Sequence, residues 1–120
     1  FSTTDTFNTA GLTGIGTGGY YEGGAATSIT GTAYGVMVLN DQGYASADLA
    51  EDDVAARNTS GTTDVIVVFL NQSTGVAEAF FDANIQNDDT IAATDSIATF
   101  SNITTLQGLT DTFSSDSFVI

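Results

Sequence analysis

The chain has no cysteine, no histidine, no lysine and no proline. Without cysteine it can form no disulfide, thiolate nucleophile or zinc–thiolate site, and without histidine it lacks the commonest catalytic base and metal ligand. The absence of lysine excludes Schiff-base chemistry and the lysine clamp of a phosphate-binding loop. Only carboxylates, hydroxyls, amides and Arg57 remain. We therefore expect no enzyme, since the one remaining catalytic arrangement is a carboxylate pair of the glycosidase type.

Basic charge is almost absent as well. Fifteen acidic residues stand against one basic residue, which gives a net charge of −14. A nucleic acid would be repelled, because binding its phosphates requires lysine and arginine. No apolar run reaches the roughly 20 residues that a membrane-spanning helix needs, so we expect no membrane insertion. The favoured partners are cations, and calcium above all, because it prefers oxygen ligands.

The length of 120 residues predicts a single domain over residues 1–120, with enough apolar residues for a core. Because the sequence starts at Phe1 rather than at methionine, we expect a processed chain or a piece of a longer one. Threonine and serine are abundant and favour pleated strands. The prediction is an all-β or β-dominant domain, a β-sandwich or small β-roll of about seven to nine strands, with one short helix near residues 48–57.

Apolar and alternating segments predict where the strands lie. Strands are expected over residues 1–10, 25–39, 64–70, 76–82 and 96–103. The glycine-rich residues 11–24 read as a loop and residues 40–43 as a turn. Asp48 and Glu51 match a capping box for the helix. The strand over residues 64–70 is too apolar for a sheet edge, so it should be central, with Phe80 or Phe81 beside it.

Four stretches of the second half carry a resemblance to a known family. They are the strand of residues 65–70, the turn Ser73-Thr74-Gly75 with the acidic strand end at residues 79–84, the strand of residues 96–102, and the chain end of residues 114–120. At the front, Thr4-Asp5-Thr6-Phe7-Asn8 adds a fifth. These patterns resemble the C-terminal domains of RTX-type, calcium-associated bacterial exoproteins exported by type I secretion, a group that includes S-layer proteins and adhesins. The nonapeptide calcium repeats of such proteins are missing here.

The polar loop of residues 82–89 is the candidate metal site. Asp82, Asn84, Asp88 and Asp89 offer oxygen ligands at alternating positions, which suits calcium, and the alternative interpretation is a solvated loop that prevents edge association. The loop is not an EF-hand, because the required glycine and the bidentate glutamate are lacking. The acidic run of residues 51–53 is most simply a favourable charge near a helix N-terminus.

Two further groups leave alternatives open. Tyr20 and Tyr21 beside Glu22 form either a sugar-stacking patch, with a surface glycan as partner, or the cover of a small core. The candidate assembly residues are Phe1, Thr3, Asp5 and Phe7, because apolar side chains are unsuited to a free tail in water. This N-terminal strand either docks within its own subunit or adds to an open sheet edge of a neighbour, which would generate a filament.

These expectations combine into one function. We expect a non-catalytic extracellular structural protein of the cell surface that self-assembles into a filament, matrix or S-layer-like polymer, with calcium as a stabilising cofactor. The missing catalytic inventory, the strand-rich composition and the family resemblance favour it. The alternative is a calcium-dependent adhesion or carbohydrate-binding module of a larger secreted protein.

Overall fold

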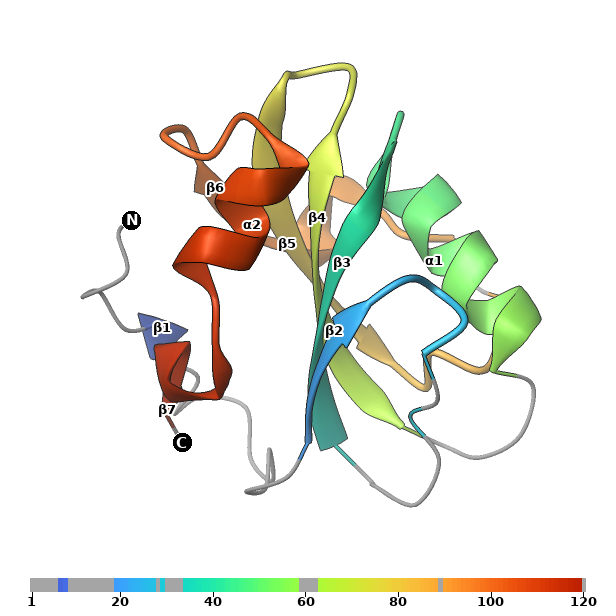
Figure 1. The fold of residues 1–120 in the computed structure, drawn as a ribbon. Coiled ribbons are helices and arrows are strands. Elements are labelled where there is room, and N and C mark those ends of the chain that lie inside the picture. Colours follow the sequence, from blue (N-terminus) through green and yellow to red (C-terminus); the bar gives the residue numbers. More distant parts are fainter. Residues whose placement is uncertain are drawn as a thin grey trace.

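A mixed five-stranded sheet lies at the centre of the structure, a computed structural model that describes residues 7–8, 19–27, 29, 34–58, 63–88 and 90–119 (Figure 1). The sheet is formed by β2 (Tyr20–Gly23), β3 (Tyr34–Tyr44), β4 (Asp64–Asn71), β5 (Val76–Ala83) and β6 (Ser96–Phe100), in that spatial order. The first three strands are parallel, and β5 and β6 continue the sheet antiparallel. Two short strands, β1 (Phe7–Asn8) and β7 (Phe118–Val119), pair with each other in parallel.

One helix covers each face of the sheet. Helix α1 (Ala47–Arg57) connects β3 to the parallel strand β4, and α2 (Leu106–Thr112) lies on the opposite face (Figure 1). The core accordingly divides into two clusters. The α1 side contains Met37, Leu39, Val54, Val67, Phe69 and Phe80, and the α2 side contains Val38, Ile66, Val68, Phe100, Leu109 and Phe113. Both faces of β4 are buried, which explains why its sequence is apolar throughout rather than alternating.

The prediction of a small, strand-dominated domain with a helix near residues 48–57 is confirmed. The prediction of about seven to nine strands in a sandwich or roll differs from the structure in two respects. The main sheet has five strands. In the described residues the two faces of this sheet are covered by helices, whereas a sandwich would place a second sheet against one of them. Helix α2 was not among the predicted elements. Neither α1 nor α2 has the length and apolar character needed to cross a membrane.

The start of α1 differs from the predicted capping box. The N-cap is Ser46, whose Oγ accepts a hydrogen bond from the backbone N of Leu49 at 3.2 Å. Asp48 is thereby placed inside the first turn rather than at the cap. Its carboxylate accepts a hydrogen bond from the backbone N of Ile91 at 2.8 Å, so a long-range contact uses the group that the local pattern assigned to capping.

Two strand boundaries also differ from the prediction. Strand β2 lies inside the glycine-rich segment expected as a loop, and the backbone N of Val36 in β3 donates to the carbonyl of Gly19 at 2.6 Å. A side chain at Gly35 would come within 3.0 Å of that carbonyl, so glycine permits this close pairing. Strand β3 also continues through residues 40–43, expected as a turn, and pairs again where Tyr44 meets Asn71.

The hairpin of β4 and β5 was predicted correctly. Phe69 pairs with Glu78, and Asn71 pairs with Val76 across the turn. The side-chain oxygen of Asn71 accepts a hydrogen bond from the backbone N of Ser73 at 2.8 Å, and Gly75 takes a positive φ of 78°. Strand β4 is central, as its apolar sequence requires, and Phe80 packs beside Phe69 with a ring-centre distance of 5.9 Å.

Candidate metal centre

The first turns of α1 bring three carboxylates to one place. Asp48, Glu51 and Asp52 each offer an oxygen, and these oxygens lie within 4.8 Å of one another. The spacing of three and four residues places them on one side of a helix. Separations below this limit are comparable to those between oxygens that share one calcium ion at about 2.3–2.6 Å, so the three carboxylates are candidates for a common ion.

Glu51 is the unusual member of this acidic cluster (Asp48, Glu51 and Asp52). It faces the core together with Ala50 and Val54, and its exposed fraction is 0%. An isolated charged carboxylate is costly to bury, so a buried glutamate is normally paired, protonated or bound to a metal. No local pattern in the sequence distinguishes it from its exposed neighbours, because burial depends on how the helix sits on the sheet.

The segment after β5 closes over the cluster. Asp48 Oδ1 receives the hydrogen bond from Ile91, and the side chain of Ile91 packs against the α1-side core. The side chain of Asp88 lies near that of Asp52. Partial desolvation, followed by the negative charges of Asp88 and Asp48, raises the pKa of Asp52. Acids far apart in the chain are therefore close enough here to oppose one another's ionisation.

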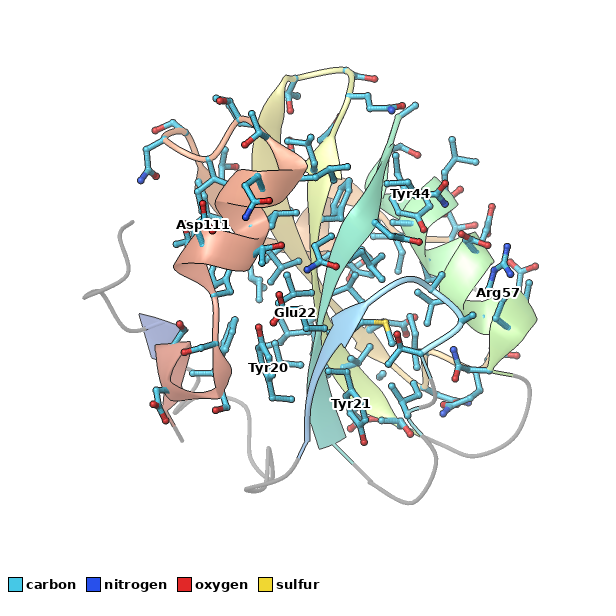
Figure 2. The ribbon with its side chains drawn as sticks, viewed as in Figure 1. Tyr20, Tyr21, Glu22, Tyr44, Arg57 and Asp111 are labelled. Carbon is cyan, nitrogen blue, oxygen red and sulfur yellow. The ribbon has the colours of Figure 1, made fainter. Side chains whose placement is uncertain are left out.

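The cluster has no basic side chain to balance it. Arg57 is the only basic residue of the chain, and it lies at the far end of α1 (Figure 2). Its Nε donates to Asp53 Oδ1 at 2.7 Å, and the hydroxyl of Tyr44 donates to Asp53 Oδ2 at 2.8 Å. The hydrogen bond from Arg57 lowers the pKa of Asp53. The single guanidinium is thus paired with Asp53 rather than with the cluster.

The predicted metal loop is only partly joined to this cluster. Asp88 contacts Asp52, whereas Asp89 lies outside the described residues. Asp82 is buried at the end of β5 with 5% of its surface exposed. Asn84 takes a left-handed conformation with φ of 85°, and its side-chain oxygen is buried without a hydrogen bond. The spacing of Asp48, Glu51 and Asp52 was visible in the sequence, but Asp48 and Glu51 were interpreted as a capping box, and residues 51–53 as favourable charge near the helix N-terminus.

A hollow of about 370 Å³ lies next to the cluster. Its lining residues include the two acids Asp48 and Glu78. Both carboxylates are already oriented by hydrogen bonds from the protein, since Glu78 accepts from the Asn71 amide at 3.0 Å and from the Thr74 hydroxyl at 2.9 Å. Asp48 therefore borders both the acidic cluster and this hollow.

The two adjacent tyrosines do not form one stacking platform. Tyr20 and Tyr21 point to opposite faces of the sheet (Figure 2). Tyr20 lies against Phe118 with ring centres 6.0 Å apart, and its hydroxyl donates to Glu22 at 3.2 Å. Burial, and then the nearby charge of Glu22, raises the pKa of Tyr20 strongly. The geometry favours the interpretation that these rings cover the core.

The candidate assembly residues lie largely outside the described part of the chain. Phe1, Thr3 and Asp5 are not described, whereas the backbone of Phe7 pairs with Phe118 of the same chain in the β1–β7 ribbon. At Phe7 and the adjacent Asn8 the N-terminal strand therefore pairs within its own subunit. Comparison of the chain with protein-family models, with curated proteins and with solved structures finds no match.

Proposed function

We propose that this chain is a non-catalytic structural module of an exported surface protein, and that a calcium ion at the acidic cluster stabilises its fold. The observation that carries the cation is the burial of Glu51 beside Asp48 and Asp52, in a chain whose single basic residue is paired elsewhere. A divalent ion removes the repulsion among these carboxylates and also reduces the net charge of −14.

Calcium suits this ligand set better than other metals. All three groups are hard carboxylate oxygens, and the chain has no histidine or cysteine to favour a transition metal. Calcium takes six to eight oxygens in a flexible geometry, so Asp88 and water can complete the shell. Magnesium demands a stricter octahedron, which three carboxylates from two adjacent turns of a helix are less suited to provide.

The structural and extracellular part of the proposal has separate support. The residue inventory disfavours catalysis, and the resemblance to exported RTX-type proteins favours the cell surface. Self-association into a layer, matrix or filament is the expected role of such a module. A calcium ion would assist it by lowering the charge repulsion between copies.

The test of the cation is thermal unfolding after complete chelation, followed by addition of calcium chloride or sodium chloride at matched ionic strength. An ion that binds only the folded state contributes about 2.7 kcal/mol at a hundredfold excess over its Kd, or a rise in Tm of about 10 °C for a domain of this size. Equal shifts with the two salts would mean screening alone and would contradict the proposal.

Matched variants localise the effect. Glu51→Gln keeps the shape of the buried side chain and removes its charge. Asp111→Asn removes one charge from the exposed side of α2, where the carboxylate of Asp111 accepts a hydrogen bond from the Gln107 amide at 2.8 Å. We expect Glu51→Gln to lose most of the calcium-specific shift while staying folded in chelator. Asp111→Asn should keep the full calcium-specific shift in Tm. If Asp111→Asn loses that shift as well, the assignment of the calcium ion to the acidic cluster is refuted.

A second candidate function is calcium-dependent glycan binding. The observation in its favour is that Asp48 belongs to the acidic cluster and also lines the hollow of about 370 Å³. A cation held there would expose part of its coordination shell to the hollow, where sugar hydroxyls can replace water. Calorimetric titration of monomeric protein with oligosaccharides, in calcium and in chelator, distinguishes this function, because a purely structural ion gives no heat of sugar binding.

A further inference from the structure

The connection from β5 to β6 lies against α1 through a short strap, defined here as residues 87–91, of which Asp89 lies outside the described residues. Just before the strap, Gln86 is tied to Thr63 by two hydrogen bonds. The backbone N of Thr63 donates to Gln86 Oε1 at 2.7 Å, and Gln86 Nε2 donates to Thr63 Oγ1 at 2.9 Å. After the strap, the chain passes through a short 3-10 helix (Ala93–Asp95) into β6. The strap therefore begins at a firm anchor.

Two contacts of opposite sign join the strap to the acidic cluster. The backbone N of Ile91 donates to Asp48 Oδ1 at 2.8 Å, which attaches the strap to the first turn of α1. The side chain of Asp88 lies near that of Asp52, and two carboxylates repel one another when both are ionised. Both contacts involve carboxylates of the cluster, so the charge of the cluster decides how firmly the strap is attached.

The packing around the strap is loose. Asn87, Asp88 and Thr90 are exposed, and Ile91 is only partly buried where it packs against the α1-side core. Two hollows, of about 370 Å³ and about 240 Å³, both include Ile91 in their lining. Segments with few apolar contacts and exposed residues open locally at a lower free energy than the whole domain unfolds. The strap has these properties, and β4 beneath α1 does not.

We propose that a calcium ion at the acidic cluster holds the strap closed over the hollow of about 370 Å³, and that the strap is released when the ion leaves. The inference rests on the calcium ion of the proposed function and names what that ion regulates. Without the ion, Asp88 is repelled by the acids of α1. With the ion bound, that repulsion is replaced by attraction, because a shell of six to eight oxygens leaves room for a further carboxylate.

The strap in turn supports the ion. The N–H of Ile91 fixes the orientation of the Asp48 carboxylate, as hydrogen bonds to metal-ligating groups commonly do. Coupling of this kind is reciprocal, so closure of the strap raises the affinity for calcium by the same factor by which calcium favours closure. Release of the strap takes Ile91 out of the lining of the hollow and uncovers part of the α1-side core. Calcium therefore controls access to this face of the sheet.

Amide hydrogen exchange of the full chain, followed residue by residue by NMR, tests the strap, because release breaks the hydrogen bond of Ile91 N–H. The rate is measured in chelator and then with calcium chloride or sodium chloride at matched ionic strength. Gly108 is the control amide, because its N–H also bonds to a side-chain oxygen, Thr105 Oγ1 at 2.9 Å, at the start of α2. We expect calcium to slow exchange at Ile91 about tenfold more than sodium does, and to change Gly108 by less than about twofold.

Neutral variants separate repulsion by Asp88 from binding of the ion. Asp88→Asn leaves the three cluster carboxylates in place, so Ile91 should exchange more slowly in this variant than in the unmodified chain, even in chelator. Asp111→Asn removes an exposed charge from α2 and should leave the rate at Ile91 unchanged in chelator. An Asp88→Asn chain whose Ile91 exchanges as fast as in the unmodified chain overturns the proposal.

The Tm distinguishes failure of the strap from failure of the ion. A calcium-specific rise in Tm with no calcium-specific slowing at Ile91 overturns the strap and leaves the ion at the acidic cluster. A chain with no calcium-specific rise in Tm contradicts the proposed function and the strap together.

Discussion

Replacement of Phe69 by alanine is the sharpest test of the core described here. Phe69 lies in the central strand β4, its exposed fraction is 0%, and it belongs to the cluster beneath α1. Its ring meets Tyr44 edge-on at a centre distance of 6.4 Å and Phe80 at 5.9 Å. Through these rings it connects β3, β4 and β5.

The expected loss can be worked from these contacts. Removing a fully buried phenylalanine side chain costs about 3–5 kcal/mol, which combines the lost transfer free energy with the cavity that remains. Edge-to-face aromatic pairs add about 0.5–1.5 kcal/mol each beyond area burial, so Phe69→Leu, which keeps most of the volume, should cost about 1–3 kcal/mol. Against a typical total stability of 5–15 kcal/mol, the alanine variant loses a large fraction.

Urea unfolding followed by circular dichroism measures the change in the free energy of unfolding for each variant. An unchanged denaturant slope shows that both variants unfold from the same folded state. Leu49→Ala is the control, because this leucine is half exposed on the outer side of α1 and its truncation should change the free energy of unfolding by less than about 0.5 kcal/mol. A loss below about 1 kcal/mol for Phe69→Ala would refute the placement of this ring in the core.

Two further predictions concern α1 and its neighbours. Ser46→Ala should lower the free energy of unfolding by about 1 kcal/mol in chemical denaturation, because Ser46 is the N-cap of α1. A loss near zero would contradict this assignment and favour Asp48 as the N-cap. Burial, and then the hydrogen bond to Asp53, raises the pKa of Tyr44 to about 12. In the unfolded chain the same phenol has a pKa of about 10, so the unfolded chain releases this proton first as the pH rises. The contribution of Tyr44 to the free energy of unfolding should therefore be fully present below about pH 10 and be lost as the pH rises from about 10 to 12. Alkaline unfolding should show a smaller fall for Tyr44→Phe, and identical curves would contradict the buried phenol.

Local sequence determined the elements with strong patterns of their own. The run from Val65 to Leu70 is β-branched and apolar, and the Asn71 to Gly75 turn has the chemistry of a hairpin, so the β4–β5 unit was predictable. The helix over residues 47–57 was also recognisable from its start and end signals, although its cap was assigned two residues late. The absence of cysteine, histidine and lysine limited the chemistry independently of any fold.

Other elements depend on partners distant in the chain. Strand β2 forms in a glycine-rich segment because β3 offers it a parallel edge, and Gly35 allows the two backbones to approach. Helix α2 has seven residues and would be marginal alone, so its packing through Leu109 on the sheet supplies its stability. Neither signal is strong within a short window of sequence.

In the acidic cluster, too, one part was determined by local sequence and another by contacts between distant segments. The sequence determined that Asp48, Glu51 and Asp52 share one side of a helix, and that a chain with one arginine cannot neutralise them with its own cations. Only the tertiary structure decided that Glu51 points into the core and that the segment containing Asp88 and Ile91 folds onto the same turn. The physical reason is that spacing along a helix is a local property, whereas burial and the meeting of distant charges depend on how the helix packs against the sheet.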